Sequence, residues 1–387
     1  MTFHRQIALI AVVACLVPVA VHTQKKTGVT DLTKPIDLSL PSESIDWTKI
    51  APLPGEKGGV DIAGPYQVAD WPQELHKDFS WGHTDGVWAE TPDRVFVIQQ
   101  SELPKLENRT GYGGVPIRRA TGNTDDRKDE HALMIFDRKG RLVDTWKQHN
   151  DLFVHAHSLK MSPYDPQHHL WVVDDGAERV YKFTNDGKLV MALGEFKVRA
   201  SDKTHFGGPT DIAFLPNGDF YISDGYKNSR VVKFSKDGKY LMEWGKKGLG
   251  PGEFILPHSI AIDAKQRLYV ADRRNSRIQV FDLNGKHLDT WPNIPKATYI
   301  AISQDQKLWA VDCFVNKVLK YDLDGKLLYS WGTVGGFEGG LWCTHQFHVD
   351  NEGNFYTAEV YGGRPQKFVP RPGEDKSHLI GPLWDGK

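Results

Sequence analysis

Three histidines recur at one position of a repeat, and they are the residues of this sequence best suited to chemistry. His157, His258 and His345 each begin a short strand-like run: His-Ser-Leu-Lys-Met, His-Ser-Ile-Ala-Ile and His-Gln-Phe-His-Val. Three protein nitrogens with a fourth position left open form the ligand set of a catalytic zinc site. Sixteen histidines against three cysteines also favour imidazole over thiolate ligands. We therefore predict that the three histidines bind one zinc ion, provided that the fold brings them together.

The histidines belong to a repeat whose period predicts the fold. Five copies run through two strands to an acidic residue, and they span His157–Asp174, Thr210–Asp224, His258–Asp272, Thr298–Asp312 and His345–Glu359. The copies start 40–53 residues apart, and a weaker sixth copy begins at Asp85. Further strands follow, joined in four copies by Asp-Gly or Asn-Gly turns, which suit tight hairpins. Four strands in about 40–50 residues are typical of propeller blades. The sequence thus predicts an all-β, six-bladed β-propeller.

Blade geometry predicts that the starts of the repeats meet at the central channel. The first strand lines the channel, and its first residue lies beside the last residue of the antiparallel second strand. His258 is therefore expected beside Asp272. At this position the blades carry Asp85, His157, Thr210, His258, Thr298 and His345, so histidine occupies every second blade. Three imidazoles with approximate threefold symmetry can converge on one ion. The alternative is a set of ordinary polar residues at a wet channel mouth.

The remaining polar residues near these positions are expected to have other roles. We expect Asp85 to lie beside the metal ligands without joining them. Five further histidines lie outside the threefold set: His83, His155 and His348, which differ in offset or strand parity, and His168 and His169. The first three are expected to be solvated or to support the site. The last two lie in a turn that we predict to be exposed on the opposite face.

The chain divides into a leader, a linker and the propeller. Residues 1–24 combine Arg5 with an apolar run at Ile7–Val21, which indicates a signal peptide or an N-terminal anchor. A lipoprotein-like motif ends at Cys15, but the apolar run continues beyond it. Residues 25–50 are polar and form a predicted linker, and residues 51–387 form the propeller. A secreted or periplasmic location follows. The net charge of −1 and the lack of a basic run exclude a nucleic-acid binder, and we expect a monomer.

Three further features concern the propeller itself. Its closure needs one more strand, taken from Gly59–Val68 or His378–Trp384, because a terminal edge needs a partner. The insertion Ser101–His131 is expected on the face of the histidines, as a functional or a disordered loop. After the leader only Cys313 and Cys343 remain, and both are expected on that face in neighbouring blades. In an oxidising compartment they can form an inter-blade disulfide or stay as two thiols.

Several stretches resemble the peptidyl-α-hydroxyglycine α-amidating lyases, which are six-bladed propellers of NHL repeats. The similarity covers about residues 80–370. It is strongest in Gly208-Pro-Thr-Asp-Ile212, Ser223-Asp-Gly-Tyr-Lys-Asn-Ser-Arg230, Leu256-Pro-His-Ser-Ile260 and the run from Ala271 to Gln279. NHL repeats alone specify a fold, and many such proteins only bind partners. The Tyr-containing and Pro-His-Ser stretches, together with the three spaced histidines, are more specific.

The resemblance implies a role for each matching residue. His157, His258 and His345 match the zinc ligands of the family, Tyr226 its catalytic tyrosine and Arg273 an active-site arginine. The family cleaves the C–N bond of a carbinolamide to give a peptide amide and glyoxylate. Zinc can lower the pKa of the substrate hydroxyl, a phenol can act as general base, and an arginine can bind the carboxylate.

The sequence departs from the family at three positions. Gln100 stands where the family has a second arginine, and glutamine cannot neutralise a carboxylate. Gln346 replaces an aspartate that helps to hold a structural calcium, which weakens the expectation of calcium. Lys227 replaces a cysteine of a disulfide. The substrate, a small molecule or a peptide, can therefore differ from that of the family. The alternatives are a propeller that binds a protein or glycan without chemistry, and a metal-dependent hydrolase or lactonase.

Overall fold

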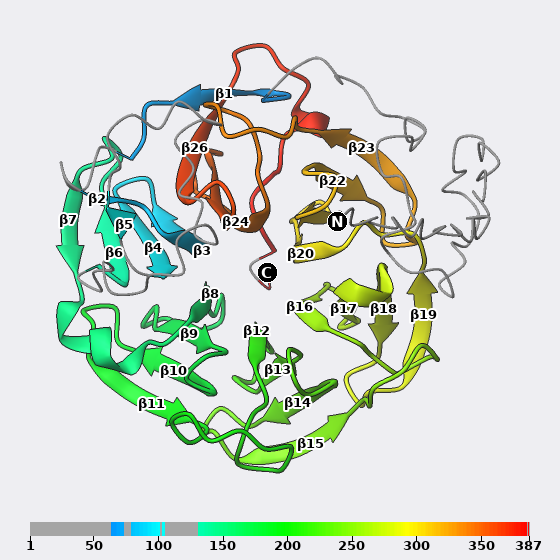
Figure 1. Cartoon of the computed structure of the whole chain (residues 1–387). Helices are drawn as coiled ribbons and strands as arrows, with labels where there is room; N and C mark the ends of the chain where they lie inside the picture. The colour runs from blue at the N-terminus through cyan, green and yellow to red at the C-terminus, as the bar shows by residue number, and fades with distance from the viewer. Residues whose placement is uncertain (1–62, 73–78, 101–102, 105–130, 385, 387) are drawn as a thin grey trace, which may run out of the picture.

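The computed structural model describes residues 63–72, 79–100, 103–104, 131–384 and 386, and these form a six-bladed β-propeller around a central channel (Figure 1). Each blade is a four-stranded antiparallel sheet, as predicted. Two further short strands, β2 (Phe79–Ser80) and β5 (Leu103–Pro104), pair with each other outside the blades. Among these residues no helix is long and apolar enough to span a membrane. The predicted leader, the linker and most of the insertion Ser101–His131 lie outside the described residues.

The strands follow one another around the ring in chain order. Blade 1 contains β3 (His83–Thr91), β4 (Arg94–Gln100), β6 (Leu133–Phe136) and β7 (Leu142–Thr145), and blade 2 contains β8 (Ala156–Met161), β9 (Leu170–Asp174), β10 (Arg179–Phe183) and β11 (Leu189–Leu193). Blade 3 contains β12 (Pro209–Phe214), β13 (Phe220–Asp224), β14 (Arg230–Phe234) and β15 (Tyr240–Trp244), and blade 4 contains β16 (Pro257–Ile262), β17 (Leu268–Asp272), β18 (Arg277–Phe281) and β19 (His287–Trp291). Blade 5 contains β20 (Ala297–Ile302), β21 (Leu308–Asp312), β22 (Val318–Tyr321) and β23 (Leu327–Trp331), and blade 6 contains β24 (Thr344–Val349), β25 (Phe355–Glu359), β26 (Arg364–Pro370) and β1 (Tyr66–Ala69).

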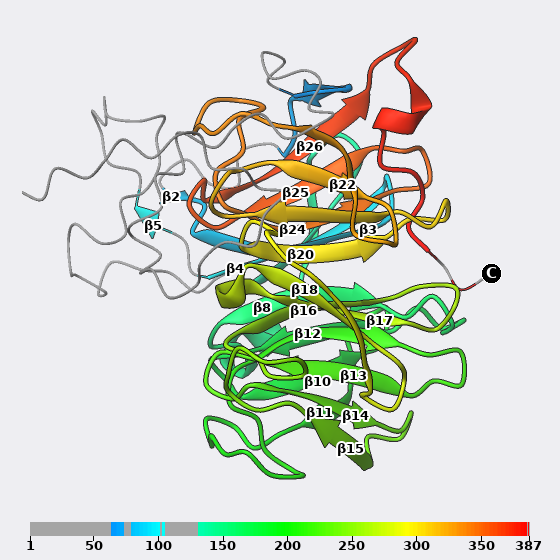
Figure 2. The same cartoon turned by 90° about the vertical axis from the view of Figure 1, so that its right-hand side faces the viewer.

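The ring is closed by the N-terminal strand. β1 pairs antiparallel with β26, with Tyr66 opposite Pro370 and Ala69 opposite Lys367. Of the two strands expected for closure, the N-terminal one is therefore correct and the C-terminal one is wrong. The C-terminal tail instead reaches the end of β20, where the amide of Trp384 donates to the carbonyl of Ile302 over 2.8 Å. Figure 2 places the C-terminus on one face of the disc, the far side in Figure 1.

Each blade begins with a β-bulge, which changes the register that we predicted. Pro257, not His258, lies opposite Asp272, and the pairing resumes with Ser259 opposite Ala271. The extra residue in each blade is Asp85, His157, Thr210, His258, Thr298 or His345. A bulge leaves one residue out of the ladder and re-aims its side chain. All six predicted positions are thus equivalent, and each is held at a bulge at the channel end of its blade.

Turn glycines pack on tryptophans of the preceding blade. A Cβ atom built on Gly285 would lie 2.6 Å from the ring of Trp244, and one on Gly325 would lie 2.6 Å from Trp291. Both glycines also have φ near +80°, a backbone conformation that other residues avoid. In blades 2, 4 and 5 the turn glycine therefore packs on a tryptophan of the preceding blade, whereas Gly238 in blade 3 packs on Leu193.

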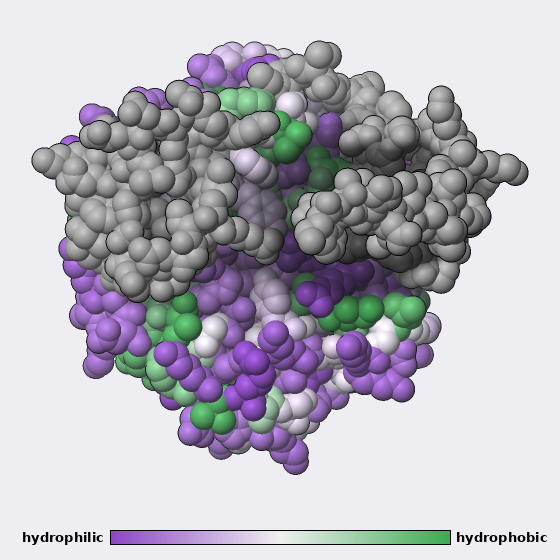
Figure 3. Space-filling model, in the orientation of Figure 1, coloured by the Kyte–Doolittle hydropathy of each residue, from purple (hydrophilic) through white to green (hydrophobic). Residues whose placement is uncertain are grey.

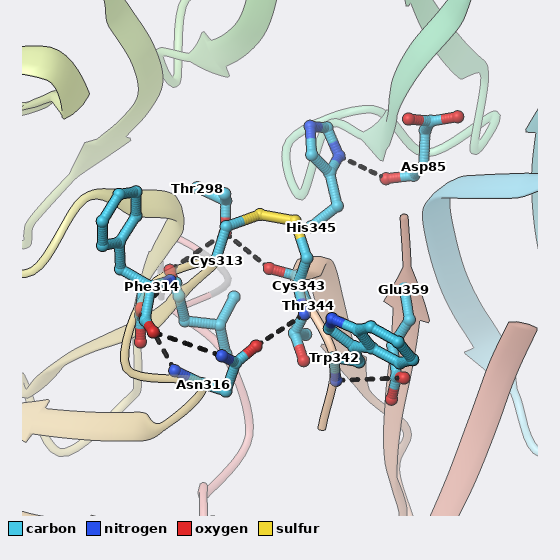
Figure 4. Close-up of a disulfide and its surroundings, with 12 residues drawn as sticks. Asp85, Thr298, Cys313, Phe314, Asn316, Trp342, Cys343, Thr344, His345 and Glu359 are labelled. Atoms are coloured by element: carbon cyan, nitrogen blue, oxygen red, sulfur yellow. Dashed lines mark hydrogen bonds between the residues drawn. A yellow bond between two sulfur atoms is a disulfide. The ribbon is translucent and has the colours of Figure 1, made fainter. Parts of the chain in front are cut away.

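Blades 5 and 6 are joined covalently. Cys313, directly after β21, forms a disulfide with Cys343, directly before β24 (Figure 4). The amide of Cys343 also donates to the side-chain oxygen of Asn316 over 2.7 Å. Of the two alternatives, the inter-blade disulfide is therefore confirmed and the pair of free thiols is wrong.

The expectation that His169 is exposed is wrong. His169 is buried, and its Nδ1 atom lies 2.6 Å from the carboxylate of Asp165, four residues earlier in the same turn. His348, which was expected to be solvated or to support the site, is buried with its ring packed on Trp88, 3.8 Å between ring centroids, which excludes the solvated alternative. His168 is exposed, as predicted, with 58% of its side chain accessible.

Candidate metal centre

The three predicted ligands converge in the structure. His157, His258 and His345 are buried, and one ligand atom of each lies within 4.8 Å of those of the other two. The Nε2 atoms of His157 and His258 are 3.2 Å apart. They come from blades 2, 4 and 6, each at the bulge that starts the first strand. The sequence pattern of histidine in every second blade therefore becomes a threefold cluster.

Backbone carbonyls of the intervening blades orient the three imidazoles. The Nδ1 atoms of His157, His258 and His345 lie 2.7 Å from the carbonyl oxygens of Thr210, Thr298 and Asp85 respectively. A carbonyl oxygen only accepts, so each Nδ1 carries the proton and each Nε2 presents its lone pair to the cluster. This is the arrangement by which metal-binding histidines are usually held. The backbone carbonyl of Asp85 thus orients His345, while the three atoms that converge all belong to the histidines.

The two intervening threonines connect the ring further. Thr210 donates from Oγ1 to the carbonyl of Pro257 over 2.9 Å, and Thr298 donates to the carbonyl of Thr344 over 2.6 Å. Each acceptor directly precedes a histidine of the cluster. One series of hydrogen bonds therefore connects the three histidine strands. It links His157 through Thr210 to the strand of His258, and His258 through Thr298 to the strand of His345.

The electrostatic environment keeps the three imidazoles neutral. Burial, and then the neighbouring histidines His345 and His258, hold the pKa of His157 well below its usual range. Burial and the nearby charge of Arg273 do the same to the pKa of His258. Burial also lowers the pKa of His345, to about 3. Neutral, buried imidazoles with fixed tautomers fit a borderline-soft divalent ion such as zinc, and they do not suit calcium, which prefers oxygen ligands.

Tyr226 lies at the open side of the cluster. Its phenol oxygen is 3.1 Å from Nε2 of His157 and 3.1 Å from Nε2 of His258. The loop after β13 is fixed by Gly208, whose carbonyl accepts from the amides of Gly225 and Tyr226. A Cβ atom on Gly208 would lie 2.6 Å from that of Tyr226, so only glycine fits there. Burial raises the pKa of Tyr226, and the charge of Arg273 acts in the opposite direction.

Arg273 is a cation next to this cluster. It begins the short helix η4 (Arg273–Asn275), and its amide donates to the carbonyl of Leu256 over 2.9 Å. It is half-buried, and its charge affects the pKa of Tyr226, His258 and His345. Among the described residues no hydrogen bond or ion pair engages its guanidinium group. The group is therefore available to an anionic ligand.

Other residues of the resembling stretches have structural roles. Asp224 accepts from the side chains of Asn228, over 2.7 Å, and Arg230, over 2.9 Å. In blade 4 the same positions repeat the contacts, with Asp272 bound by Asn275 and Arg277. The Asp, Asn and Arg of the motif thus hold the loops that present Tyr226 and Arg273.

His155, which was expected to be solvated or to support the site, borders the cluster together with Asp175, which the sequence did not single out. The Nδ1 atom of His155 lies 2.7 Å from the carboxylate of Asp175, and its Nε2 lies 3.5 Å from that of Asp85. These carboxylates outweigh burial and raise the pKa of His155 to about 9. Gln100 donates to the Asp85 carboxylate over 3.3 Å. The position of His155, two residues before His157, indicated that it lies near the site, but nothing in the sequence indicated its pairing with Asp175.

The face that carries the cluster is mixed in polarity. Figure 3 views this face, and the visible residues around the channel mouth are mostly hydrophilic, with hydrophobic residues in separate places. Phe314 and Tyr361, in loops that follow β21 and β25, expose 40% and 50% of their surface.

Comparisons with known proteins agree with the fold and with the resemblance. A family model described as a 6-bladed beta-propeller matches residues 196–300. The peptidyl-glycine alpha-amidating monooxygenase of Mus musculus is 31% identical over 254 residues, covering 63% of this chain and 22% of the relative. Peptidyl-alpha-hydroxyglycine alpha-amidating lyase 1 of Drosophila melanogaster is 32% identical over 154 residues, 37% of this chain and 27% of the relative.

A third relative carries no enzyme name. The NHL repeat-containing protein 3 of Homo sapiens is 32% identical over 170 residues, 42% of this chain and 48% of the relative. The chain thus spans less than half the length of each of these three relatives. A solved structure of a candidate gluconolactonase, 14% identical, covers 80% of this chain and 93% of its own with a TM-score of 0.50, which supports the fold alone.

Proposed function

Because this chain is a relative of the amidating lyases and the NHL-repeat propellers, we propose that it is a zinc-dependent carbon–nitrogen lyase. Its substrate would be a carbinolamide that carries a carboxylate, and its products an amide and glyoxylate. The observation that carries this proposal is the position of the Tyr226 phenol, 3.1 Å from Nε2 of both His157 and His258, with Arg273 nearby.

The three histidines would hold the metal through their Nε2 atoms. When bound, a divalent ion such as zinc lowers the pKa of a hydroxyl group beside it. The hydrogen bonds from Nδ1 to the carbonyls of Thr210, Thr298 and Asp85 keep the three donors in place. The site therefore needs no rearrangement of the ligands when the ion enters.

Arg273 would orient the substrate. A guanidinium group binds a carboxylate through two parallel hydrogen bonds, which fixes both its position and its direction. Gln100, which stands where the family has a second arginine, donates to the carboxylate of Asp85 instead. Arg273 would therefore define the carboxylate end of the substrate. The exposed ring of Phe314 offers apolar contact for the acyl part.

Tyr226 would carry the proton. In its phenolate form it takes the proton from the substrate hydroxyl, and the electron pair left on oxygen forms the C=O bond of glyoxylate. The C–N bond breaks, and its electron pair stays on the amide nitrogen, which takes up a proton that Tyr226 can return. Burial raises the pKa of Tyr226, and the charge of Arg273 opposes that rise, which is the direction that a base requires.

The cellular setting and the assembly state belong to the same proposal. The disulfide Cys313–Cys343 is favoured in an oxidising compartment, so we place the enzyme outside the cytoplasm, secreted or periplasmic. We expect it to act as a monomer.

Glyoxylate release tests the proposal. Purified protein is incubated with an N-acyl-α-hydroxyglycine, and glyoxylate and the primary amide are measured in parallel. We expect equimolar products, almost none with His258→Ala and normal amounts with His168→Ala, a histidine on the opposite face. Metal-loaded protein that releases neither product would refute the lyase. Hydrolysis of a lactone by the same preparation would then favour a hydrolase.

A further inference from the structure

The channel contains a second, oxygen-rich cluster beyond the histidines. Asp211 directly follows the bulge residue of blade 3, and Ser259 follows that of blade 4. The Oδ2 atom of Asp211 accepts from the Ser259 hydroxyl over 2.7 Å and from the amide of Ile260 over 3.0 Å. Ser259 in turn accepts from the amide of Ile300 in blade 5 over 3.1 Å. The carboxylate of Asp211 thus joins neighbouring blades at the centre of the ring.

The ammonium group of Lys160 occupies the middle of this cluster. Its Nζ atom lies 2.8 Å from Oδ2 of Asp211, 2.9 Å from the carbonyl oxygen of Ile212 and 3.2 Å from that of Ile260. It also lies 4.9 Å from the ring centre of Tyr299. Lys160 is 8% exposed and comes from blade 2, so one amine connects four blades.

The groups around the amine are those that bind hard cations. Carboxylate and backbone carbonyl oxygens are the typical ligands of calcium, and an ammonium is a compact point charge that can take such a place. Burial lowers the pKa of Lys160, and the Asp211 carboxylate acts against this. An unpaired carboxylate at this depth would be costly, so the two charges depend on each other.

The calcium that the resemblance suggests does not fit these residues. Gln346, which stands in place of the family's aspartate, binds both backbone groups of Leu159 across the channel: its oxygen accepts from the amide over 3.1 Å, and its nitrogen donates to the carbonyl over 2.6 Å. A Cβ atom on Gly86 would lie 2.8 Å from the Gln346 oxygen, so the amide fills the available space. Position 346 therefore supplies no negative charge for calcium, and the carboxylate of Asp211 is already paired with Lys160.

We propose that Lys160 is a built-in cation that takes the place of a channel metal, so that the inner ends of blades 2 to 5 are joined without calcium. Removing the amine while keeping Asp211 should then leave a site for a divalent cation. Lys160 also lines a pocket at the channel mouth opposite the histidines, together with Trp88 and Trp384. A cavity left by a shorter side chain would thus have a route to solvent.

Calcium-dependent stability tests this inference without any assay of activity. Thermal unfolding is measured with and without millimolar calcium for the wild type, Lys160→Ala and the double variant Lys160→Ala/Asp211→Asn. We expect no calcium response from the wild type. Lys160→Ala should lose about 5–10 °C in Tm, as expected when one partner of a buried ion pair is removed, and should recover several degrees in calcium. The double variant should not respond, because the carboxylate is gone. Magnesium is the control, since its smaller octahedral shell suits this cluster poorly.

Each outcome decides the question. Folding of Lys160→Ala only in the presence of calcium supports the proposal. A wild type that binds one equivalent of calcium, lost in Asp211→Asn, overturns it. So does a Lys160→Ala variant that is as stable as the wild type and indifferent to calcium. If Lys160→Ala does not fold under any condition, calcium binding is measured for the wild type and for Asp211→Asn instead. The absence of calcium binding by both proteins then supports Lys160 as the built-in cation.

Discussion

The Nδ1 atom of His345 lies 2.7 Å from the carbonyl oxygen of Asp85, although 260 residues separate them in the chain (Figure 4). This hydrogen bond crosses the joint between the last blade and the first. The third imidazole of the cluster is therefore oriented only when the ring is closed, so the geometry of the site depends on the integrity of the whole propeller.

Metal content is the first prediction. We expect about one equivalent of zinc per chain, and a loss of at least tenfold in affinity for His157→Ala, His258→Ala or His345→Ala, since each removes one of three ligands. Elemental analysis after dialysis measures occupancy, and circular dichroism checks that the β fold persists. His168→Ala should keep its metal. Full occupancy in a triple histidine variant would remove this site from consideration.

Tyr226→Phe separates chemistry from packing. The change removes only the phenol oxygen, which contacts Nε2 of His157 and His258. A loss of roughly 10²–10⁴ in kcat is expected, the usual contribution of a positioned acid or base, with zinc content unchanged. Tyr361→Phe, on an exposed tyrosine of the same face, is the matched control. Wild-type turnover in Tyr226→Phe would assign the phenol a structural role.

Arg273→Gln should act on binding more than on proton transfer. Loss of the guanidinium removes the proposed carboxylate contact, so KM should rise at least tenfold while metal content stays the same. Arg274→Gln, the exposed neighbour in the same short helix, is the matched control and should change KM little. Equal effects of the two substitutions would contradict a specific role for Arg273.

The disulfide should stabilise the joint between blades 5 and 6. Cys313→Ser/Cys343→Ser opens a loop with a sequence separation of 30 residues, which is expected to cost about 3 kcal/mol. Thermal or urea unfolding of chains without residues 1–24 measures this loss. The wild type should show no free thiol when denatured without reductant. Two titratable thiols would contradict the bond.

The raised pKa of Glu359 predicts that the stability of the fold depends on pH. Burial, partly offset by Arg364, raises its pKa from an ordinary 4.5 to about 7 in the folded chain. Ionisation is thus easier in the unfolded state. The resulting penalty is absent below about pH 4.5, grows between the two pKa values and is complete above pH 7.

A neutral variant tests this sign. In Glu359→Gln the fall in unfolding free energy between pH 5 and pH 8 should shrink by on the order of 2 kcal/mol, even if the variant is somewhat less stable at pH 5. Urea unfolding at both pH values measures the difference. Glu374→Gln, at a partly exposed position, is the control. An unchanged fall in Glu359→Gln would show that this carboxyl is not the source.

Much of the fold and of the site could be predicted from the sequence, because both depend on a repeat. Alternating strands and Asp-Gly turns determine the blades, and the position of histidine in every second copy indicates the cluster of His157, His258 and His345. The disulfide between Cys313 and Cys343 follows from the same alignment of blades. Such predictions succeed where one position has the same environment in each repeat.

The remaining features depend on contacts between unlike residues. The bulge that shifts His258 away from Asp272 arises from backbone geometry that leaves no mark in the residue types. The burial of His169 depends on one carboxylate, that of Asp165. The role of Lys160 depends on Asp211, 51 residues later, and neither residue recurs in the other blades. A lysine in a strand looks ordinary until the ring places it in the channel.

The closure of blade 6 by β1 has a consequence for the order of events during synthesis. A ribosome makes Tyr66–Ala69 first, but its partner Arg364–Pro370 emerges last. Until then β24, β25 and β26 cannot complete their sheet, and the first strand waits as an unpaired edge that other chains could capture. A nascent chain would therefore keep an unpaired edge until residues 364–370 are made, and termination before residue 364 would leave the first five blades able to form while the ring stays open.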